Sequence, residues 1–236
     1  MSARVQNIQK TLRSLADRKT ALELQRFFKT KKGEYGESDR FLGIRVPKLR
    51  SYLNACKDIS IFEISTLLKS AFHEERMFSL LMLVSRFLKG DDKEKKSVYE
   101  TYLKHTEYIN SWDLVDCSAH HIVGSYLIML DKQPIYDLAV SDVLWERRIA
   151  MVSSFYFIKH HEFEDALAIA KMLKTDTEDL IHKAVGWMLR EIGKRDLLSE
   201  EKFLKLHYKT MPRTMLRYAI EKFEEEKRQA YLKGNI

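Results

Sequence analysis

Residues 74–84 read Glu-Glu-Arg-Met-Phe-Ser-Leu-Leu-Met-Leu-Val, and this stretch shows most clearly which secondary structure the chain forms. Met77, Leu80, Leu81 and Val84 follow the i, i+3, i+4, i+7 spacing of one buried helix face. The chain contains only 8 Gly and 3 Pro, whereas strand-rich folds need such turn residues often. The sequence therefore predicts an all-α fold with short connections, in which the one substantial loop covers residues 31–40.

The helices are expected to alternate in length along the chain. Shorter amphipathic segments are predicted at residues 61–70, 94–105, 134–140, 163–174 and 200–209. Longer helices are expected to begin near Glu74, Ser111, Glu146, His182 and Arg213, at intervals of 37, 35, 36 and 31 residues. Such alternation is typical of an α-solenoid. We predict a single domain over residues 1–236, built from degenerate HEAT-like helical repeats; an irregular helical bundle is the alternative.

Composition and charge limit the class of protein. Hydrophobic residues make up 45% and charged residues 32% of the 236 positions, which is an ordinary globular balance. The net charge of +7 favours a polyanionic partner, either nucleic acid or a membrane surface. Cys56 and Cys117 form no disulfide framework, and no signal peptide or apolar span is apparent. We therefore expect a soluble cytoplasmic protein, associated with the nucleoid if the source is bacterial.

Basic side chains recur at the same phase of the later long helices. Lys183, Trp187, Arg190 and Lys194 share one helix face. The other members of the set open two further helices, as Arg147 with Arg148 and Arg213 with Arg217. Stacked repeats place equivalent helices along one concave surface, so this set favours a concave face that binds the phosphate backbone of duplex DNA. The alternative is that each cation lies on a solvated helix face.

The segment Asn110-Ser-Trp-Asp-Leu-Val-Asp116 is the unusual one. Ser111 is a candidate N-cap, and Trp112 and Asp116 share a helix face one turn apart. A carboxylate on a wall otherwise predicted to be basic disfavours DNA binding alone, but it suits catalysis on a cationic substrate. The alternative is that Asp113 interacts with the helix dipole and that Asp116 pairs with a nearby arginine.

Several separated motifs resemble the DNA alkylation repair family of HEAT-like-repeat DNA glycosylases, the AlkD type. The resemblance extends from about Gln25 to Lys194, in the order and spacing of that family. It is carried by Phe41-Leu-Gly-Ile-Arg-Val-Pro47, Trp112-Asp-Leu-Val-Asp116, Trp145-Glu-Arg-Arg148 and Lys183-Ala-Val-Gly-Trp187-Met-Leu-Arg190-Glu. It implies an all-α solenoid that removes positively charged N3- and N7-alkylated purines from duplex DNA.

The resemblance also implies roles for individual residues. Asp116 stands at the place of the catalytic carboxylate, with Asp113 as a supporting acid. Trp112 and Trp187 stand at the places of the aromatic pair that lies against the sugar and backbone of the lesion.

DNA contacts are implied in the same way. Arg148 matches a cleft arginine at the DNA backbone, and Arg190 and Arg50 match further basic positions. Phe27 stands where a tyrosine is found in the best-known type, so the aromatic surface remains and the hydroxyl is lost.

The expected base-excision chemistry also predicts which catalytic groups the protein does not need. An alkylated purine already carries positive charge and leaves readily, so no second general acid is needed. No lysine is singled out by an apolar setting for a Schiff base, so we predict hydrolysis without strand cleavage. The pairs His120-His121 and His160-His161 are poor metal ligands, because adjacent side chains point apart on a helix. We expect no metal, no cofactor and no membrane partner, and a monomer that binds double-stranded DNA containing alkylated bases.

Two other functions stay open at this point. The first is a non-catalytic helical-repeat protein that binds damaged or branched DNA. The second is a protein-interaction scaffold, which predicts apolar or mixed residues on the concave face in place of a cationic stripe. Salt-sensitive DNA binding separates the scaffold from the other two, and base release separates the enzyme from the binder.

Overall fold

The protein is described by a computed structural model that covers residues 2–56 and 58–236. Contacts between Cα atoms divide the chain into two compact units, Met1–Ser118 and Ala119–Ile236. Helices are the regular secondary structure of both units over the described residues, and a single isolated bridge joins Arg40 and Phe72. The all-α prediction is therefore confirmed, and the single-domain assignment stays a prediction.

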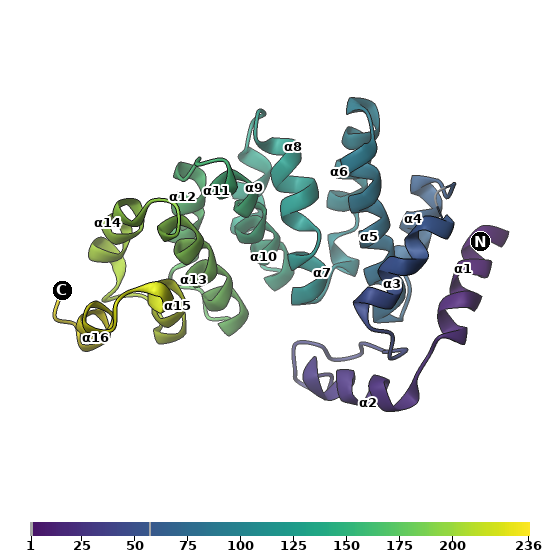
Figure 1. Cartoon of the computed structure of the whole chain (residues 1–236), viewed down its shortest axis with the longest axis horizontal. Helices are drawn as coiled ribbons and strands as arrows, with labels where there is room; N and C mark the ends of the chain where they lie inside the picture. Colours follow the sequence, from purple (N-terminus) through teal and green to yellow (C-terminus); the bar gives the residue numbers. More distant parts are fainter. Residues whose placement is uncertain (1, 57) are drawn as a thin grey trace. The chain divides into compact units, whose positions relative to one another are not determined.

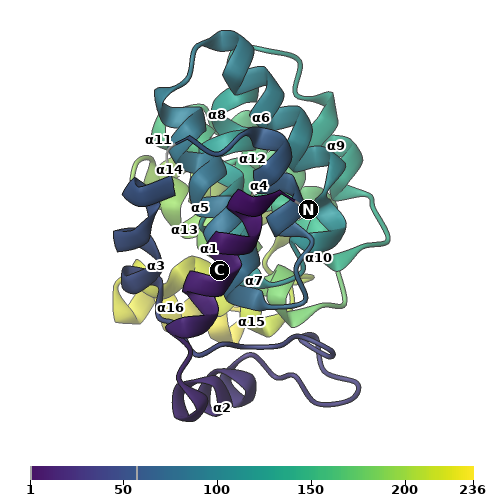
Figure 2. The same ribbon diagram turned by 90° about the vertical axis from the view of Figure 1, so that its right-hand side faces the viewer.

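Unit 1 contains seven α-helices and two short 3₁₀ turns among its described residues (Figure 1). In order, they are α1 (Ala3–Ser14), α2 (Arg18–Phe27), α3 (Val46–Tyr52), η1 (Leu53–Cys56), α4 (Ile61–Leu68), α5 (His73–Lys89), α6 (Asp92–Lys104), η2 (Thr106–Tyr108) and α7 (Trp112–Asp116). Helix α4 packs on α1 and on α5, and α5 packs on α6. Both views show α2 lying crosswise at one end of these helices (Figures 1 and 2).

Helix α5 is the core element of unit 1. Met77, Leu80 and Leu81 of the predicted face are buried on it, and Val84 is half-buried. Phe78 and Leu83, which lie outside that face, are fully buried as well. Its partner α4 begins with a capping box, in which the Ser60 side chain accepts from the backbone of Glu63 and the Glu63 carboxylate accepts in return. The capping box of α4 and the apolar face of α5 therefore both favour the helices that are observed.

The loop between α2 and α3 is fixed by one buried carboxylate. Glu74 accepts hydrogen bonds from the backbone N–H groups of Leu42, Gly43 and Ile44, at 2.7 to 3.1 Å. Gly43 has a φ of 84°, and an added Cβ would lie 2.1 Å from the carbonyl oxygen of Asp17, so only glycine fits there. This contact gives a structural reason for the segment Phe41–Pro47 that resembles the family.

Unit 2 contains the remaining helices. They are η3 (His120–Gly124), α8 (Ser125–Leu127), α9 (Gln133–Ala139), α10 (Leu144–Ser153), α11 (Phe155–Lys159), α12 (Glu164–Leu173), α13 (Asp179–Gly193), α14 (Leu197–His207), α15 (Arg213–Ala219), η4 (Ile220–Lys222) and α16 (Glu225–Lys233). Helix α13 is central, because it packs on α10, α12, α14 and α15. Gly186 allows α15 to approach α13 closely, since an added Cβ would lie 2.4 Å from the carbonyl oxygen of Met215.

Within each unit, helices that follow one another along the chain pack together, as they do in an α-solenoid. All five predicted shorter segments are present as α4, α6, α9, α12 and α14, and the loop predicted over residues 31–40 is present as a series of turns. The HEAT-like repeat and the concave DNA-binding face stay predictions. Over the described residues, no helix combines the length and the apolar character that a membrane crossing requires.

Three of the five longer helices are shorter than the sequence predicted. The helix that starts after Ser111 ends at Asp116, and the helix that starts near Glu146 ends at Ser153. The Ser118 hydroxyl donates to the Leu114 carbonyl at 2.5 Å, and the Ser154 hydroxyl donates to the Met151 carbonyl at 2.7 Å. Such bonds compete with the helical ladder and favour a bend or an end. Helix α15 covers only Arg213–Ala219 and passes into the 3₁₀ turn η4.

Candidate functional site

Helix α7 carries three of the predicted site residues on five positions. Leu114 and Val115 are fully buried and anchor the helix, whereas Trp112, Asp113 and Asp116 are half-buried. Because Trp112 and Asp116 are four positions apart, the indole and the carboxylate lie on the same side of the helix. The fold thus presents an aromatic ring and an acid together on one rigid turn.

The start of α7 differs in detail from the prediction. Ser111 does occupy the N-cap position, but its side chain makes no capping hydrogen bond, and its buried Oγ has no hydrogen-bond partner among the described residues. The helix is therefore held at this end by burial and by side chains from other helices. Asp113 makes the most important of these contacts.

Asp113 is bound to a buried histidine of α5. Its Oδ2 lies 2.8 Å from His73 Nε2, and His73 Nδ1 lies 2.9 Å from Asp39 Oδ2. Arg76 donates a further hydrogen bond to Asp39. Burial alone lowers the pKa of His73, but the carboxylates of Asp113 and Asp39 outweigh it and raise the pKa to about 9. His73 is therefore an imidazolium at neutral pH, and Asp113 is one of its two counter-ions.

This network separates the roles of the two acids. Both ring nitrogens of His73 are taken by Asp113 and Asp39, so Asp116 has no place in the pair. The prediction that Asp113 is the supporting residue gains a physical reason, since it orients α7 through His73. Sequence reasoning missed His73, because its partners are 34 and 40 positions away.

An aromatic cavity of about 330 Å³ adjoins the indole of Trp112. The Trp112 ring is stacked on Phe28 with centroids 5.4 Å apart, and it meets Phe27 edge-on at 6.0 Å. Phe41 adds a third phenyl ring to the lining, stacked on Phe28 at 5.1 Å. Phe27 is 62% exposed, so one aromatic wall of the cavity is open to solvent.

Arg50 lies close enough to the acids to influence the same buried thiol. Burial raises the pKa of Cys117, the carboxylates of Asp113 and Asp116 raise it further, and the Arg50 guanidinium lowers it. Unit 1 therefore brings together five of the predicted site residues: Phe27, Arg50, Trp112, Asp113 and Asp116. Both cysteines, Cys56 and Cys117, are free thiols.

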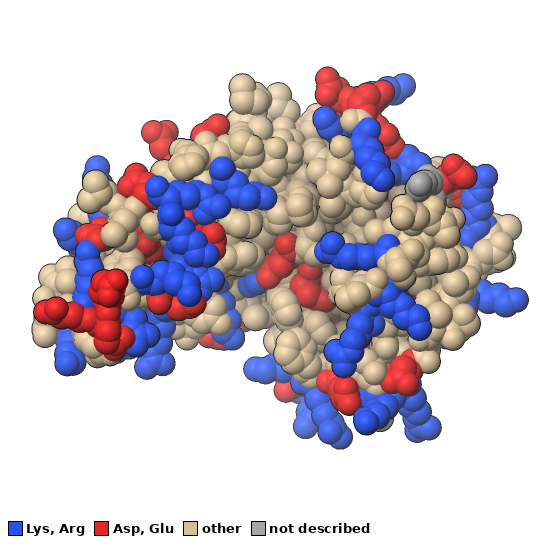
Figure 3. All heavy atoms as spheres, viewed as in Figure 1, with Lys and Arg blue, Asp and Glu red and all other residues tan. Residues whose placement is uncertain are grey.

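Most of the predicted basic residues of unit 2 are paired with carboxylates. Arg147 binds Asp176 through Nε at 2.6 Å, and Lys183 binds Asp179 at 2.6 Å. Arg190 binds Glu221, and Lys194 binds Glu191 at 2.5 Å. Figure 3 shows the result, since Lys and Arg side chains are interspersed with Asp and Glu side chains on the visible face of unit 2. Counting cations in the sequence therefore overstated the free positive charge of these helices.

The remaining predicted cations of unit 2 differ in exposure. Arg148 is 5% exposed, and its Nη1 donates to the Leu180 carbonyl at 2.5 Å, which ties α10 to the second residue of α13. Arg213 is exposed and donates to the Leu232 carbonyl, and Arg217 is exposed as well. Phosphate binding by Arg148 stays a prediction, and its guanidinium already has a structural role.

Trp187 lies on α13 beside an aromatic ring that the sequence analysis did not single out. The Phe155 ring centroid is 5.6 Å from that of the half-buried Trp187 and 5.3 Å from that of His120. His120 and His121 also lie closer together than predicted, with ring centroids 3.8 Å apart. The expectation that these neighbours point apart was wrong, because both lie on the π-helical turn η3, where the wider turn changes the side-chain directions.

Asp116 and Trp112 belong to unit 1, and Trp187, Arg148 and Arg190 belong to unit 2. Because the two sets of residues lie in different units, their assembly into one active site stays a prediction. Across the described residues, no cluster of three or more His, Cys, Asp and Glu side chains is placed to hold a metal ion.

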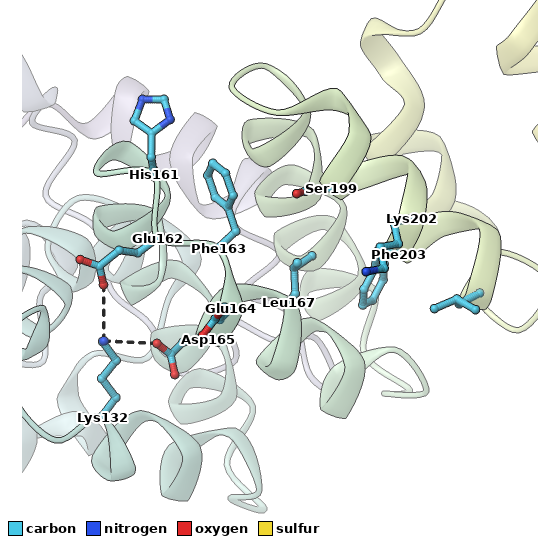
Figure 4. Close-up of a pocket in the computed structure, with 11 residues that line it drawn as sticks. Lys132, His161, Glu162, Phe163, Glu164, Asp165, Leu167, Ser199, Lys202 and Phe203 are labelled. Atoms are coloured by element: carbon cyan, nitrogen blue, oxygen red, sulfur yellow. Dashed lines mark hydrogen bonds and ion pairs between the residues drawn. The ribbon is translucent and has the colours of Figure 1, made fainter.

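A cavity of about 680 Å³ in unit 2 is lined by none of the predicted site residues. Glu162, Glu164 and Asp165 line one part of it, and Lys132 lies 3.5 Å from Glu162 and 3.3 Å from Asp165 (Figure 4). Three carboxylates against Lys132 and Lys202 leave this wall poorly suited to a DNA phosphate.

The comparisons with known proteins fit this combination of an all-helical fold and an acid–indole pair. The family model described as DNA alkylation repair enzyme matches residues 8–223, so the chain belongs to the DNA alkylation repair enzyme family. Its fold is similar to a solved structure described as a predicted DNA alkylation repair enzyme from Enterococcus faecalis. The TM-score is 0.68 at 15% identity, over 89% of this chain and 97% of the other, which shows a shared fold. Among curated proteins, none matches the chain.

Proposed function

We propose that this protein is a DNA glycosylase that hydrolyses the N-glycosidic bond of positively charged N3- and N7-alkylated purines in duplex DNA. Membership of the DNA alkylation repair enzyme family supports the substrate class. The observation that carries the proposal is α7, where Trp112 and Asp116 lie one turn apart and Asp113 is already bound to His73. One acid holds the helix in place, and the other lies beside the indole.

Asp116 suits the charge that develops in this reaction. An alkylated purine leaves as a neutral base, so positive charge builds on the deoxyribose as the C1′–N bond breaks. A carboxylate in a fixed position stabilises that charge and orients a water molecule for attack at C1′. The base needs no protonation, so a single acid suffices.

The aromatic residues act on the same cation. Trp112 and Trp187 are proposed to lie against the sugar and backbone of the lesion, since an indole face attracts a cation by about 0.5–2 kcal/mol. Phe27 extends the aromatic surface beside Trp112. It lacks the hydroxyl of the family tyrosine, so its contribution is the ring alone.

DNA binding is proposed to use the basic residues of both units. Arg50 in unit 1 and Arg217 in unit 2 are exposed and available for phosphate contacts. Four cations have carboxylate partners and can bind phosphate only by exchanging the carboxylate for it: Arg147, Lys183, Arg190 and Lys194. Arg148 and Arg213 donate to backbone carbonyls, and they can add phosphate contacts if those hydrogen bonds are released. We propose a monomeric cytoplasmic enzyme that uses no cofactor and leaves the DNA strand intact.

The decisive experiment measures release of 7-methylguanine and 3-methyladenine from methylated duplex DNA. We expect Asp116→Asn to lower the rate about a hundredfold or more while DNA binding persists. Asp113→Asn is the matched control, because it makes the same chemical change one turn earlier on α7. We expect it to lower the stability of unit 1 through His73 and to affect the rate less.

Two results would contradict the proposal in different ways. If Asp113→Asn abolishes release and Asp116→Asn does not, the two acids have been assigned the wrong roles. If the native chain binds DNA but releases neither base, the protein is a non-catalytic DNA-binding member of the family. Absence of salt-dependent DNA binding would leave the protein-interaction scaffold.

A further inference from the structure

One cluster of cationic and imidazole side chains in unit 2 contains a lysine without a carboxylate partner among the described residues. It consists of His120 on η3, Lys159 on α11, and Arg195 just after α13. Lys159 Nζ lies 3.4 Å from His120 Nδ1, and no carboxylate of the described residues is within ion-pair distance of that ammonium. The other basic side chains of α13 that the sequence singled out each have a carboxylate partner.

The cluster is assembled around the ring of Phe155. The Lys159 ammonium lies 4.9 Å and the Arg195 guanidinium 5.9 Å from its centroid, and the rings of His120 and Trp187 are 5.3 and 5.6 Å away. Helix α11 packs on both η3 and α13. Three chain segments therefore place these groups on a packed aromatic base.

Electrostatic repulsion in the cluster is incompletely neutralised. Arg195 shares the carboxylate of Glu191 with Lys194, so one negative charge faces two positive charges, and Lys159 adds a third. Burial and the nearby Arg195 lower the pKa of the Lys159 ammonium. Burial, His121 and Lys159 lower the pKa of His120 to about 3, so His120 is neutral at pH 7. Lys159 and His120 therefore bind their protons less tightly, because both are shielded from water and each lies near another basic group.

We propose that His120, Lys159 and Arg195 form a binding site for a phosphate group in unit 2. A phosphate oxygen accepts from the Lys159 ammonium and from the guanidinium of Arg195, and it gives Lys159 the anionic partner that the described part of the chain does not provide. The Nδ1 of neutral His120 faces Lys159, so its Nε2–H is available as a third donor. The source of the phosphate is the DNA backbone, and that part rests on the proposed function; a free phosphate ion has the same chemistry.

The site explains why repulsive charges are kept together at this place. Like charges around Lys159 cost stability in the free protein, and a bound dianion or phosphodiester converts that cost into affinity. Trp187, which the resemblance places at the sugar and backbone of the lesion, is linked to the cluster through Phe155. A phosphate held here fixes the position of a strand next to that indole without reading its sequence.

The first test compares Lys159→Gln with the native chain for binding of unmodified duplex DNA at several salt concentrations. We expect the affinity to fall roughly tenfold and the slope of log affinity against log salt to fall by about one. Lys205→Gln is the matched control, since it removes the same charge from an exposed lysine of α14 in the same unit. Lys159→Gln should also melt at or above the native temperature, because repulsion with Arg195 is relieved.

The second test titrates inorganic phosphate while the imidazole of His120 is observed by NMR. We expect phosphate to raise the His120 pKa in the native chain and not in Lys159→Gln, and duplex DNA to displace the phosphate. Phosphate binding that DNA does not displace would overturn the DNA backbone as the source and assign the site to the free ion.

An unmoved His120 resonance, together with a native salt slope for Lys159→Gln, would overturn the phosphate site. These measurements use undamaged DNA and no base release. A chain that shows them but releases no alkylated base would contradict the glycosylase proposal and leave the phosphate site standing.

Discussion

His73 Nε2 lies 2.8 Å from Asp113 Oδ2, although forty positions separate the two residues in the chain. On the other side of the ring, His73 Nδ1 lies 2.9 Å from Asp39 Oδ2. One buried imidazolium thus joins the loop after α2, the start of α5 and the helix α7 that carries Trp112 and Asp116. The position of the proposed catalytic acid therefore depends on a proton held in the core of unit 1.

The pH dependence of stability should reveal that proton. The pKa of His73 is about 9 in the folded chain, above the ordinary value of 6.5. Its contribution is fully present below about pH 6.5 and is lost as the pH rises through 9, because the folded state then has to release the proton. We expect the free energy of unfolding to fall by about 3 kcal/mol over that range. Denaturant unfolding between pH 6 and 10 measures it.

His73→Gln is the variant that isolates this contribution. Its amide NH2 can still donate to one of the two carboxylates, but the charge and the titration are removed. The variant should be less stable than the native chain at pH 6 and should approach it at pH 10. A native stability profile that stays level through pH 9 would show that His73 is not an imidazolium.

Phe27 should matter for DNA and hardly at all for folding. Its ring is 62% exposed, and its main aromatic neighbours are Phe28 and Trp112. We expect Phe27→Ala to lower base release about tenfold, since each such aromatic contact contributes about 1–3 kcal/mol with nucleic acid. Its thermal melting should change little. Phe27→Tyr restores the hydroxyl of the family and should retain the native rate or exceed it; a loss as large as that of the alanine variant would show that a hydroxyl does not fit.

Glu200 should destabilise unit 2 at alkaline pH. It is 2% exposed, and burial together with the charge of Glu201 raises its pKa to about 8, against 4.5 for the ordinary group. The folded state therefore holds this proton more tightly than the unfolded chain, and stability is lost as the pH rises from about 4.5 through 8.

Glu200→Gln removes this titration while keeping the shape of the side chain. At pH 9, we expect the variant to be more stable than the native chain by about 3 kcal/mol. At pH 4, we expect the two to differ much less. Thermal melting at the two pH values measures the difference. Equal melting temperatures at pH 9 would mean that Glu200 is ionised without cost.

Arg147 and Arg217 should separate the two roles that the sequence assigned to one basic set. The Arg147–Asp176 pair is largely buried, with 15% and 6% of the side chains exposed, so Arg147→Ala should destabilise unit 2 by about 3 kcal/mol. Arg217→Ala should leave stability unchanged and lower the salt dependence of DNA binding by about one phosphate contact. Urea unfolding and DNA titration at two salt concentrations check both; a reversed pattern would place Arg147 on the DNA.

Periodicity and capping predicted most of the helices, because both depend on residues within a few positions of one another. Met77, Leu80 and Leu81 of α5 and the buried side of α12 appear where the i, i+3, i+4 spacing placed them. The ends were predicted less well. Near two of these ends, the hydroxyls of Ser118 and Ser154 donate to backbone carbonyls. Such bonds join a hydroxyl to a backbone oxygen, so the hydrophobic pattern carries no trace of them.

The sequence by itself determined the helical class, the family and the candidate site residues of α7. Each of these depends on residues that lie close together in the chain. Only the tertiary structure decided which charges are neutralised. It pairs Arg147 with Asp176 and His73 with Asp113, and it leaves Lys159 against His120 without a carboxylate. The physical reason is range: helix propensity acts over one or two turns, whereas an ion pair depends on where packing brings residues some thirty or forty positions apart.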